Sequence, residues 1–174
     1  MRSQLLCILG LICAALPLAA QSDQWHDYKN AGGNFSVLMP AEPQESSGGE
    51  SALTSHTIQA ISNSIGYTVV YVVIPAEQVV DEPKYKIYRD SFMKSLPNCD
   101  LITEAGPSVA QRGYVGHWYR MNCLVKGSNY TFVGNLYWGK HYAYAVMAMF
   151  PSTSTTPPSA AKFTDSFAVI DPAK

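Results

Sequence analysis

Residues 67–74 have the sequence Tyr-Thr-Val-Val-Tyr-Val-Val-Ile, and this stretch decides the fold. Every position except Thr68 carries an apolar or aromatic side chain, and six of the eight side chains are β-branched. Because such residues favour strands, and because both faces of the run are apolar, the pattern predicts a central strand that is covered on both sides. Pro75 ends this strand, since proline has no N–H to donate to a neighbouring strand.

Alternating and periodic patterns on either side of this run predict further strands and two helices. Strands are expected at 35–39, 54–62, 99–104, 111–125, 130–138 and 141–150, with a turn-rich connection at 42–52. Helices are expected at 81–96, with apolar Tyr85, Tyr88, Phe92 and Leu96, and at 157–170, with apolar Phe163, Phe167 and Ile170. Consecutive hairpins with few helices indicate an α+β fold: an antiparallel β-sheet of about six to seven strands with helices packed on its faces.

The strand expected at 141–150 shows why both faces of the sheet need cover. One face would carry His141, Ala143, Ala145, Met147 and Met149, and the other Tyr142, Tyr144, Val146, Ala148 and Phe150. Both sets are largely apolar, so water cannot be the neighbour of either face. The two helices and the entry segment 21–33 are expected to supply the cover.

The length and composition indicate one globular domain. The chain has 174 residues, of which 47% are hydrophobic and 14% are charged, and its formal net charge is -1. A disordered chain would show low hydrophobicity and a high net charge, and a nucleic-acid-binding domain would show a basic patch. We therefore expect a single α+β domain at 34–171, an entry segment at 21–33, and no nucleic-acid partner.

Residues 1–20 have the pattern of a signal peptide. Arg2 provides the positive start, 5–16 form an apolar run, and small residues precede Gln21. A membrane anchor is one alternative, but a spanning helix needs about 20 apolar residues and this run is shorter. A lipoprotein signal is another, but Cys13 follows isoleucine rather than a small residue. The sequence thus predicts an exported protein, periplasmic or secreted, with no membrane span after cleavage.

Two cysteines remain after the signal, Cys99 and Cys123, and they lie 24 positions apart. An even number of cysteines in an exported chain predicts a disulfide, because export compartments are oxidising. Closing a loop of this length would stabilise the fold by about 3 kcal/mol. Two free buried thiols are the alternative.

No familiar catalytic motif occurs in the chain. It contains no G-x-S-x-G turn, no phosphate-binding glycine loop and no dinucleotide-binding fingerprint. Its histidines are His26, His56, His117 and His141. They lack the spacing of zinc ligands, so no metal and no cofactor is expected. Asp100 and Glu104 are an even distance apart on one expected strand, so they should share a face, which we interpret as solvated.

Aromatic residues are concentrated in the last three expected strands. The candidate binding surface consists of His117, Trp118, Tyr137, Trp138 and His141. Aromatic side chains with polar tips are enriched at interfaces and in ligand grooves. The alternative is ordinary strand packing, because tyrosine and tryptophan are good strand residues that pair across strands.

Residues 35–43, Phe-Ser-Val-Leu-Met-Pro-Ala-Glu-Pro, follow the pattern F-x-V-x-x-P-x-x-P. With T-V-x-Y at 68–71, Arg89-Asp90 in a helix and Phe-Thr-Asp-Ser-Phe at 163–167, the chain resembles small exported bacterial proteins of unassigned function with a PsbP-like α/β sandwich. The resemblance implies an antiparallel sheet with helices on both faces, and non-catalytic roles. That fold includes an extrinsic subunit of photosystem II and a Ran-binding protein, but no partner-binding residues of either carry over.

Two functions of different classes follow. The first is an exported, non-enzymatic binding or accessory module of the cell envelope, with an envelope or extracellular protein as its partner. The second is a small-molecule-binding protein or an unrecognised hydrolase, with a pocket between sheet and helix. In that case His117 or His141 would be the acid or base, since histidine titrates near neutral pH. A purely structural envelope protein is a third possibility.

Overall fold

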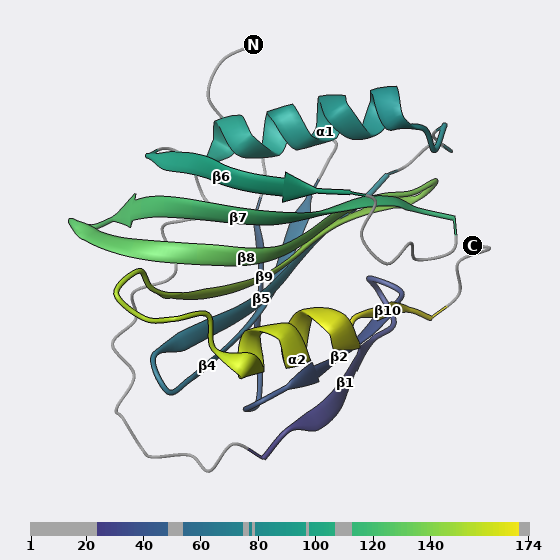
Figure 1. The fold of residues 1–174 in the computed structure, drawn as a ribbon. Coiled ribbons are helices and arrows are strands. Elements are labelled where there is room, and N and C mark those ends of the chain that lie inside the picture. Colours follow the sequence, from purple (N-terminus) through teal and green to yellow (C-terminus); the bar gives the residue numbers. More distant parts are fainter. Residues whose placement is uncertain are drawn as a thin grey trace.

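The computed structural model describes residues 24–48, 54–74, 77, 79–96, 98–106 and 113–170, and the expected signal peptide lies outside the described residues. Within these ranges, two antiparallel sheets and two helices form the structure (Figure 1). The predicted fold class is confirmed, because the main sheet has seven antiparallel strands and helices pack against it.

The main sheet has the strand order β3-β4-β5-β9-β8-β7-β6. Its strands are β3 (Gln44–Gly48), β4 (Ser55–Ser62), β5 (Ile65–Val73), β6 (Cys99–Ala105), β7 (Val115–Val125), β8 (Ser128–Trp138) and β9 (Tyr142–Pro151). The small sheet, of order β1-β2-β10, consists of β1 (His26–Asn30), β2 (Phe35–Met39) and β10 (Ala168–Val169). The helices are α1 (Glu82–Ser95) and α2 (Pro158–Ser166). Figure 1 shows α1 on one side of the main sheet, and α2 with the small sheet on the other.

The apolar run that predicted a central strand forms β5. This strand pairs with β4 on one side and with β9 on the other. Tyr67, Val69 and Tyr71 are buried in the core on the side of α2, whereas Val70 packs against the core on the side of α1. Both faces of the run therefore contribute to a core, which is why the run lacks the polar alternation of a half-exposed strand.

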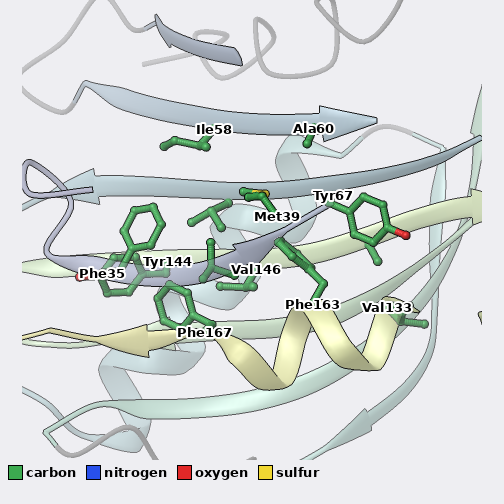
Figure 2. Packing of buried hydrophobic residues seen from close by; sticks show 14 of the residues in the cluster. Phe35, Met39, Ile58, Ala60, Tyr67, Val133, Tyr144, Val146, Phe163 and Phe167 are labelled. Atoms are coloured by element: carbon green, nitrogen blue, oxygen red, sulfur yellow. The ribbon is translucent and has the colours of Figure 1, made fainter. Parts of the chain in front are cut away.

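The first core lies between the main sheet, α2 and the small sheet, and aromatic rings dominate it (Figure 2). Phe35 and Phe163 are fully buried. The ring of Phe35 on β2 lies 6.0 Å from that of Tyr144 on β9, and the ring of Phe163 on α2 lies 5.4 Å from that of Tyr67 on β5. Fully burying such a side chain is worth about 1.5–3 kcal/mol. These contacts hold α2 and β2 to the sheet.

The second core lies between α1 and the main sheet. Helix α1 begins where the sequence predicts, because the Asp81 carboxylate accepts a hydrogen bond from the backbone N–H of Lys84 at 2.8 Å. The buried residues of this core are Tyr85, Phe92, Leu96, Tyr119, Met121, Cys123, Val125, Phe132, Leu136, Ala145 and Met147. Strand β9 contributes to both cores in the predicted alternation, with Ala145 and Met147 here and Tyr144, Val146, Ala148 and Phe150 in the first.

The structure corrects three local assignments of the sequence analysis. Part of the entry segment forms β1, and part of the expected turn-rich connection forms β3. These segments are largely polar, and their strand conformation comes from pairing with β2 and β4. The closing helix ends at Ser166 rather than at residue 170, and Ala168 and Val169 pair with β2 instead.

Cys99 and Cys123 confirm the predicted disulfide. They lie directly opposite each other on β6 and β7, and their sulfur atoms are 2.00 Å apart. The bond ties the edge strand β6 to the rest of the main sheet.

Candidate functional site

The structure divides the five residues of the predicted aromatic surface between the two sides of the main sheet. Neighbouring residues of a strand point to opposite faces. Trp118 of β7 and Tyr137 of β8 accordingly pack on the first core, on the side of α2. His117 and Trp138 contact α1 on the other side, and His141 lies in the loop between β8 and β9. These five residues do not share one face.

Packing and hydrogen bonds within the fold hold Tyr137 and Trp138 in place. Tyr137 is only 3% exposed, and its ring stacks on that of Phe167 with the centroids 5.4 Å apart. The indole Nε1 of Trp138 donates to the carbonyl oxygen of Val79 at 3.1 Å, and its ring lies 5.5 Å from that of Tyr88. These contacts explain their place in the strands without a ligand.

Trp118 belongs to a set of four β7 side chains on the side of α2 that we call the β7 row: Trp118, Arg120, Asn122 and Leu124. Helix α2 packs on β8 and β9, and the β7 row lies beyond it. Trp118 and Arg120 are half-buried, whereas Asn122 and Leu124 are exposed. A guanidinium nitrogen of Arg120 donates to Oγ1 of Thr156 at 2.8 Å, in the loop before α2. The row thus presents an indole, a guanidinium, an amide and an aliphatic group to solvent.

A buried amide adjoins this row. Asn135 lies directly opposite Trp118 in the pairing of β7 with β8, and it is 6% exposed. Its Oδ1 atom accepts no hydrogen bond from the described residues. Buried polar atoms almost always have a partner, protein or ordered water, so Oδ1 of Asn135 is an exception among the described residues. Because this atom is buried, the group at this end of the row that a partner can reach is the half-buried Trp118 ring rather than the Asn135 amide.

A second cluster of polar side chains lies between α1 and the other side of the sheet, and it depends on a β-bulge in β6. The pairing of β6 with β7 shifts between Leu101 and Thr103. Asp100 therefore opposes Asn122, whereas Glu104 opposes Tyr119 on the side of α1. The prediction that Asp100 and Glu104 share a solvated face is wrong, because one extra residue in a strand reverses the alternation beyond it.

Glu104 is the centre of this cluster. Its carboxylate accepts from a guanidinium nitrogen of Arg89 at 2.6 Å and from the Tyr119 hydroxyl at 3.0 Å. The Nδ1 atom of His117 lies 3.0 Å from the same carboxylate, and the Nε2 atom lies 3.1 Å from a carboxylate oxygen of Glu82. Glu104 and His117 are only 24% and 14% exposed, so the cluster is partly shielded from water. We call these five residues the Glu104 cluster.

Aromatic groups extend the Glu104 cluster into the second core. The ring of Tyr85 stacks on that of His117 with the centroids 4.4 Å apart, and the hydroxyls of Tyr85 and Tyr119 are hydrogen-bonded. Burial raises the pKa of Tyr119, and the hydrogen bond to Glu104 raises it further. Burial opposes the charge of Arg89, but hydrogen bonds to its carboxylate partners outweigh this and raise its pKa. Both groups therefore keep their protons throughout the physiological range.

The Glu104 cluster connects α1 to strands β6 and β7, and its side chains are not arranged around one point as metal ligands would be. The two ring nitrogens of His117 contact different carboxylates, so these groups do not converge on one point. The described residues contain no group of three metal-ligating side chains. Gly106 is also part of the arrangement, because a Cβ at that position would lie 2.3 Å from Nδ1 of His117. Sequence reasoning missed this cluster, since nothing in the spacing of residues reveals the bulge.

We expect the substitution Glu104→Gln to lower the free energy of unfolding by about 1–3 kcal/mol, because Arg89 and His117 would lose the charge that they contact in a partly buried site. Urea unfolding followed by circular dichroism measures this. The matched control is Glu82→Gln, which removes a carboxylate with one contact and 45% exposure and should cost less than about 1 kcal/mol. If the two substitutions lower the free energy of unfolding equally, Glu104 is not the centre of the cluster.

Comparison of the chain with models of protein families and with curated proteins gives no match. Among the helices of the described ranges, none is long and apolar enough to cross a membrane. The function must therefore be argued from the surfaces themselves, and the β7 row is an accessible surface that contains a predicted site residue, Trp118.

Proposed function

We propose that this protein is an exported, non-enzymatic binding module and that it binds a protein partner through the β7 row. The observation that carries the proposal is the arrangement of four partly or fully exposed side chains in one row on the side of α2: Trp118, Arg120, Asn122 and Leu124. Tryptophan and arginine supply a large share of the binding energy at protein interfaces. Leu124, 47% exposed, would lose further apolar surface to a partner.

Export is supported by two independent features. The first is the signal pattern of residues 1–20, and the second is the disulfide between Cys99 and Cys123. Disulfides persist in oxidising compartments and are rare in the cytosol. A periplasmic or extracellular location, and hence a partner in the envelope or outside the cell, agrees with both. The resemblance to PsbP-like sandwich proteins remains a prediction that points the same way.

The alternative, a hydrolase or small-molecule site between helix and sheet with His117 or His141 as acid or base, has less support. His141 lies in the loop between β8 and β9. Both ring nitrogens of His117 are engaged by carboxylates, and the ring is stacked on Tyr85. A histidine that acts as acid or base must bring one ring nitrogen within hydrogen-bond reach of the substrate proton, and here the Nε2 atom faces Glu82 instead. A structural role of His117, which connects α1 to the sheet, accounts for the same contacts.

The proposal predicts that Trp118→Ala weakens capture of the partner at least tenfold while the protein stays folded, because a half-buried tryptophan contributes more than about 1.4 kcal/mol to a typical interface. A photo-crosslinking amino acid at Asn122, within the row, captures the partner from the native host for identification by mass spectrometry. Binding of the purified partner to each variant is then measured by surface plasmon resonance.

The control is Ile87→Ala on α1, which removes an apolar side chain that is 62% exposed on the opposite side of the sheet. A crosslinker at Ile87 should capture nothing that the Asn122 crosslinker captures. If Trp118→Ala leaves the affinity unchanged, or if Ile87 captures the same partner with equal yield, the β7 row is not the binding surface.

A further inference from the structure

A hollow of about 270 Å³ lies where two hairpins of the main sheet end, away from the β7 row. Its lining comes from the β4–β5 hairpin, the β7–β8 hairpin and β9, and consists of Ile61, Ser64, Gly66, Val125, Lys126, Ser128, Tyr130 and Met149. Val125 and Met149 belong to the second core or pack against it, which places the hollow on the side of α1. It therefore faces away from the side that carries the β7 row.

Two tight turns shape the rim of the hollow. Ser62 pairs with Ile65, so the β4–β5 turn consists of Asn63 and Ser64, both with positive φ. Val125 pairs with Ser128, so the β7–β8 turn consists of Lys126 and Gly127, again with positive φ. Two-residue turns of this kind match the twist of the strands and fix their register. Lys126 and Ser64 are thus held at defined places on the rim.

The backbone conformation and packing do not require a glycine at position 66, but an open hollow does. Its φ is not in the left-handed region, and a Cβ would meet only side-chain atoms of Met149, the nearest at 3.4 Å. A side chain would therefore fit, although glycine within a strand lowers stability. Gly66 pairs with Met149 and Ile61, which also line the hollow. The absence of a side chain at this position keeps the hollow open.

The lining specifies the chemistry of a ligand. Ile61, Val125 and Met149 provide apolar walls, and Tyr130 provides a half-buried ring. Lys126 is the one charged residue of the lining, and it forms no ion pair with the residues that the structure describes. A half-open, largely apolar hollow with a single cation on its rim suits a molecule with an apolar body and one negative group.

We propose that this hollow is a binding site for a small amphipathic carboxylate, with its hydrocarbon part over Gly66 and against Met149 and its carboxylate at Lys126. The volume of about 270 Å³ is just below that of typical small-ligand sites, which begin at about 300 Å³, so a short acyl chain or a single ring fits and a long lipid does not. This site is separate from the protein-binding surface proposed above and does not depend on it.

The test is isothermal titration calorimetry of the purified protein with sodium octanoate, and with octanol as the neutral counterpart. We expect saturable octanoate binding with one site per chain and at least fivefold weaker binding of octanol. Gly66→Val should abolish octanoate binding while the melting temperature stays the same or rises, because valine favours a strand and fills the hollow. Lys126→Gln should weaken octanoate at least fivefold and leave octanol unchanged.

The control is Lys29→Gln, which removes an exposed lysine of β1 and should leave octanoate binding unchanged. The proposal is overturned if octanoate does not saturate a single site below about 5 mM, or if it binds Gly66→Val as it binds the unaltered protein. It is also overturned if Lys126→Gln and Lys29→Gln have equal effects, because the carboxylate would then not be at Lys126. Capture of a protein by the β7 row has no bearing on any of these outcomes.

Discussion

Replacing Gly134 with alanine is expected to destabilise the protein by at least about 4 kcal/mol and to lower its melting temperature by at least about 10 °C. Gly134 lies on β8 between Tyr119 of β7 and Met147 of β9. A Cβ at this position would lie 1.9 Å from the carbonyl oxygen of Val146 and 2.8 Å from Cα of Met147. These are backbone atoms of the next strand, so relief requires β8 and β9 to separate. Thermal unfolding followed by circular dichroism measures the effect.

The matched control is Gly48→Ala in the edge strand β3. A Cβ at Gly48 has no atom within 4 Å, and its φ does not lie in the left-handed region. We expect its melting temperature to remain within about 2 °C of the unaltered protein. If the melting temperature of Gly134→Ala is in the same range as that of Gly48→Ala, then β8 and β9 do not lie as close together at Gly134 as we describe.

Removing the disulfide is expected to have the second largest effect. The double substitution of Cys99 and Cys123 by alanine should lower the free energy of unfolding by about 3 kcal/mol, because the unfolded chain is no longer restricted by a loop that joins positions 24 residues apart. For a chain of this size, the melting temperature should fall by about 6–12 °C. A reducing agent should produce a similar fall in the unaltered protein.

The double variant also serves as the control for effects of the reducing agent itself. Because it has no Cys99–Cys123 disulfide, its melting curve should not change when the agent is added. Counting free thiols by mass spectrometry before and after reduction gives an independent reading. A melting curve of the unaltered protein that does not respond to full reduction would contradict a stabilising role for this bond.

Much of the architecture could be predicted from local patterns. The apolar run of β5, the two-sided alternation of β9 and the Asp81 cap of α1 are all visible in the sequence, because each depends on residues within one element. Strands β1 and β3 could not be predicted in this way. Their polar sequences become strands through pairing with β2 and β4, and such pairing leaves no periodic trace in the chain.

The candidate sites were less predictable than the fold. Trp118 was among the residues predicted from aromatic density, but Tyr137 and Trp138 of the same group are used in packing. Strand register decides which β7 side chains share a face, and the packing of α2 on β8 and β9 decides that the row is not buried under a helix. The Glu104 cluster depends on a bulge within β6, which moves Glu104 to the face of α1. Neither feature is a property of a short segment.

The sequence by itself determined the fold class, the central strand and the cysteine pair. Burial on two faces requires apolar residues at successive positions, and a signal pattern followed by two cysteines predicts a disulfide. Only the tertiary structure decided which aromatic side chains reach solvent, which carboxylate meets His117, and that Gly66 opens a hollow. The physical reason is the range of the interactions. Periodicity is set by neighbours along the chain, whereas surfaces and clusters are formed by residues that strand register and helix packing bring together.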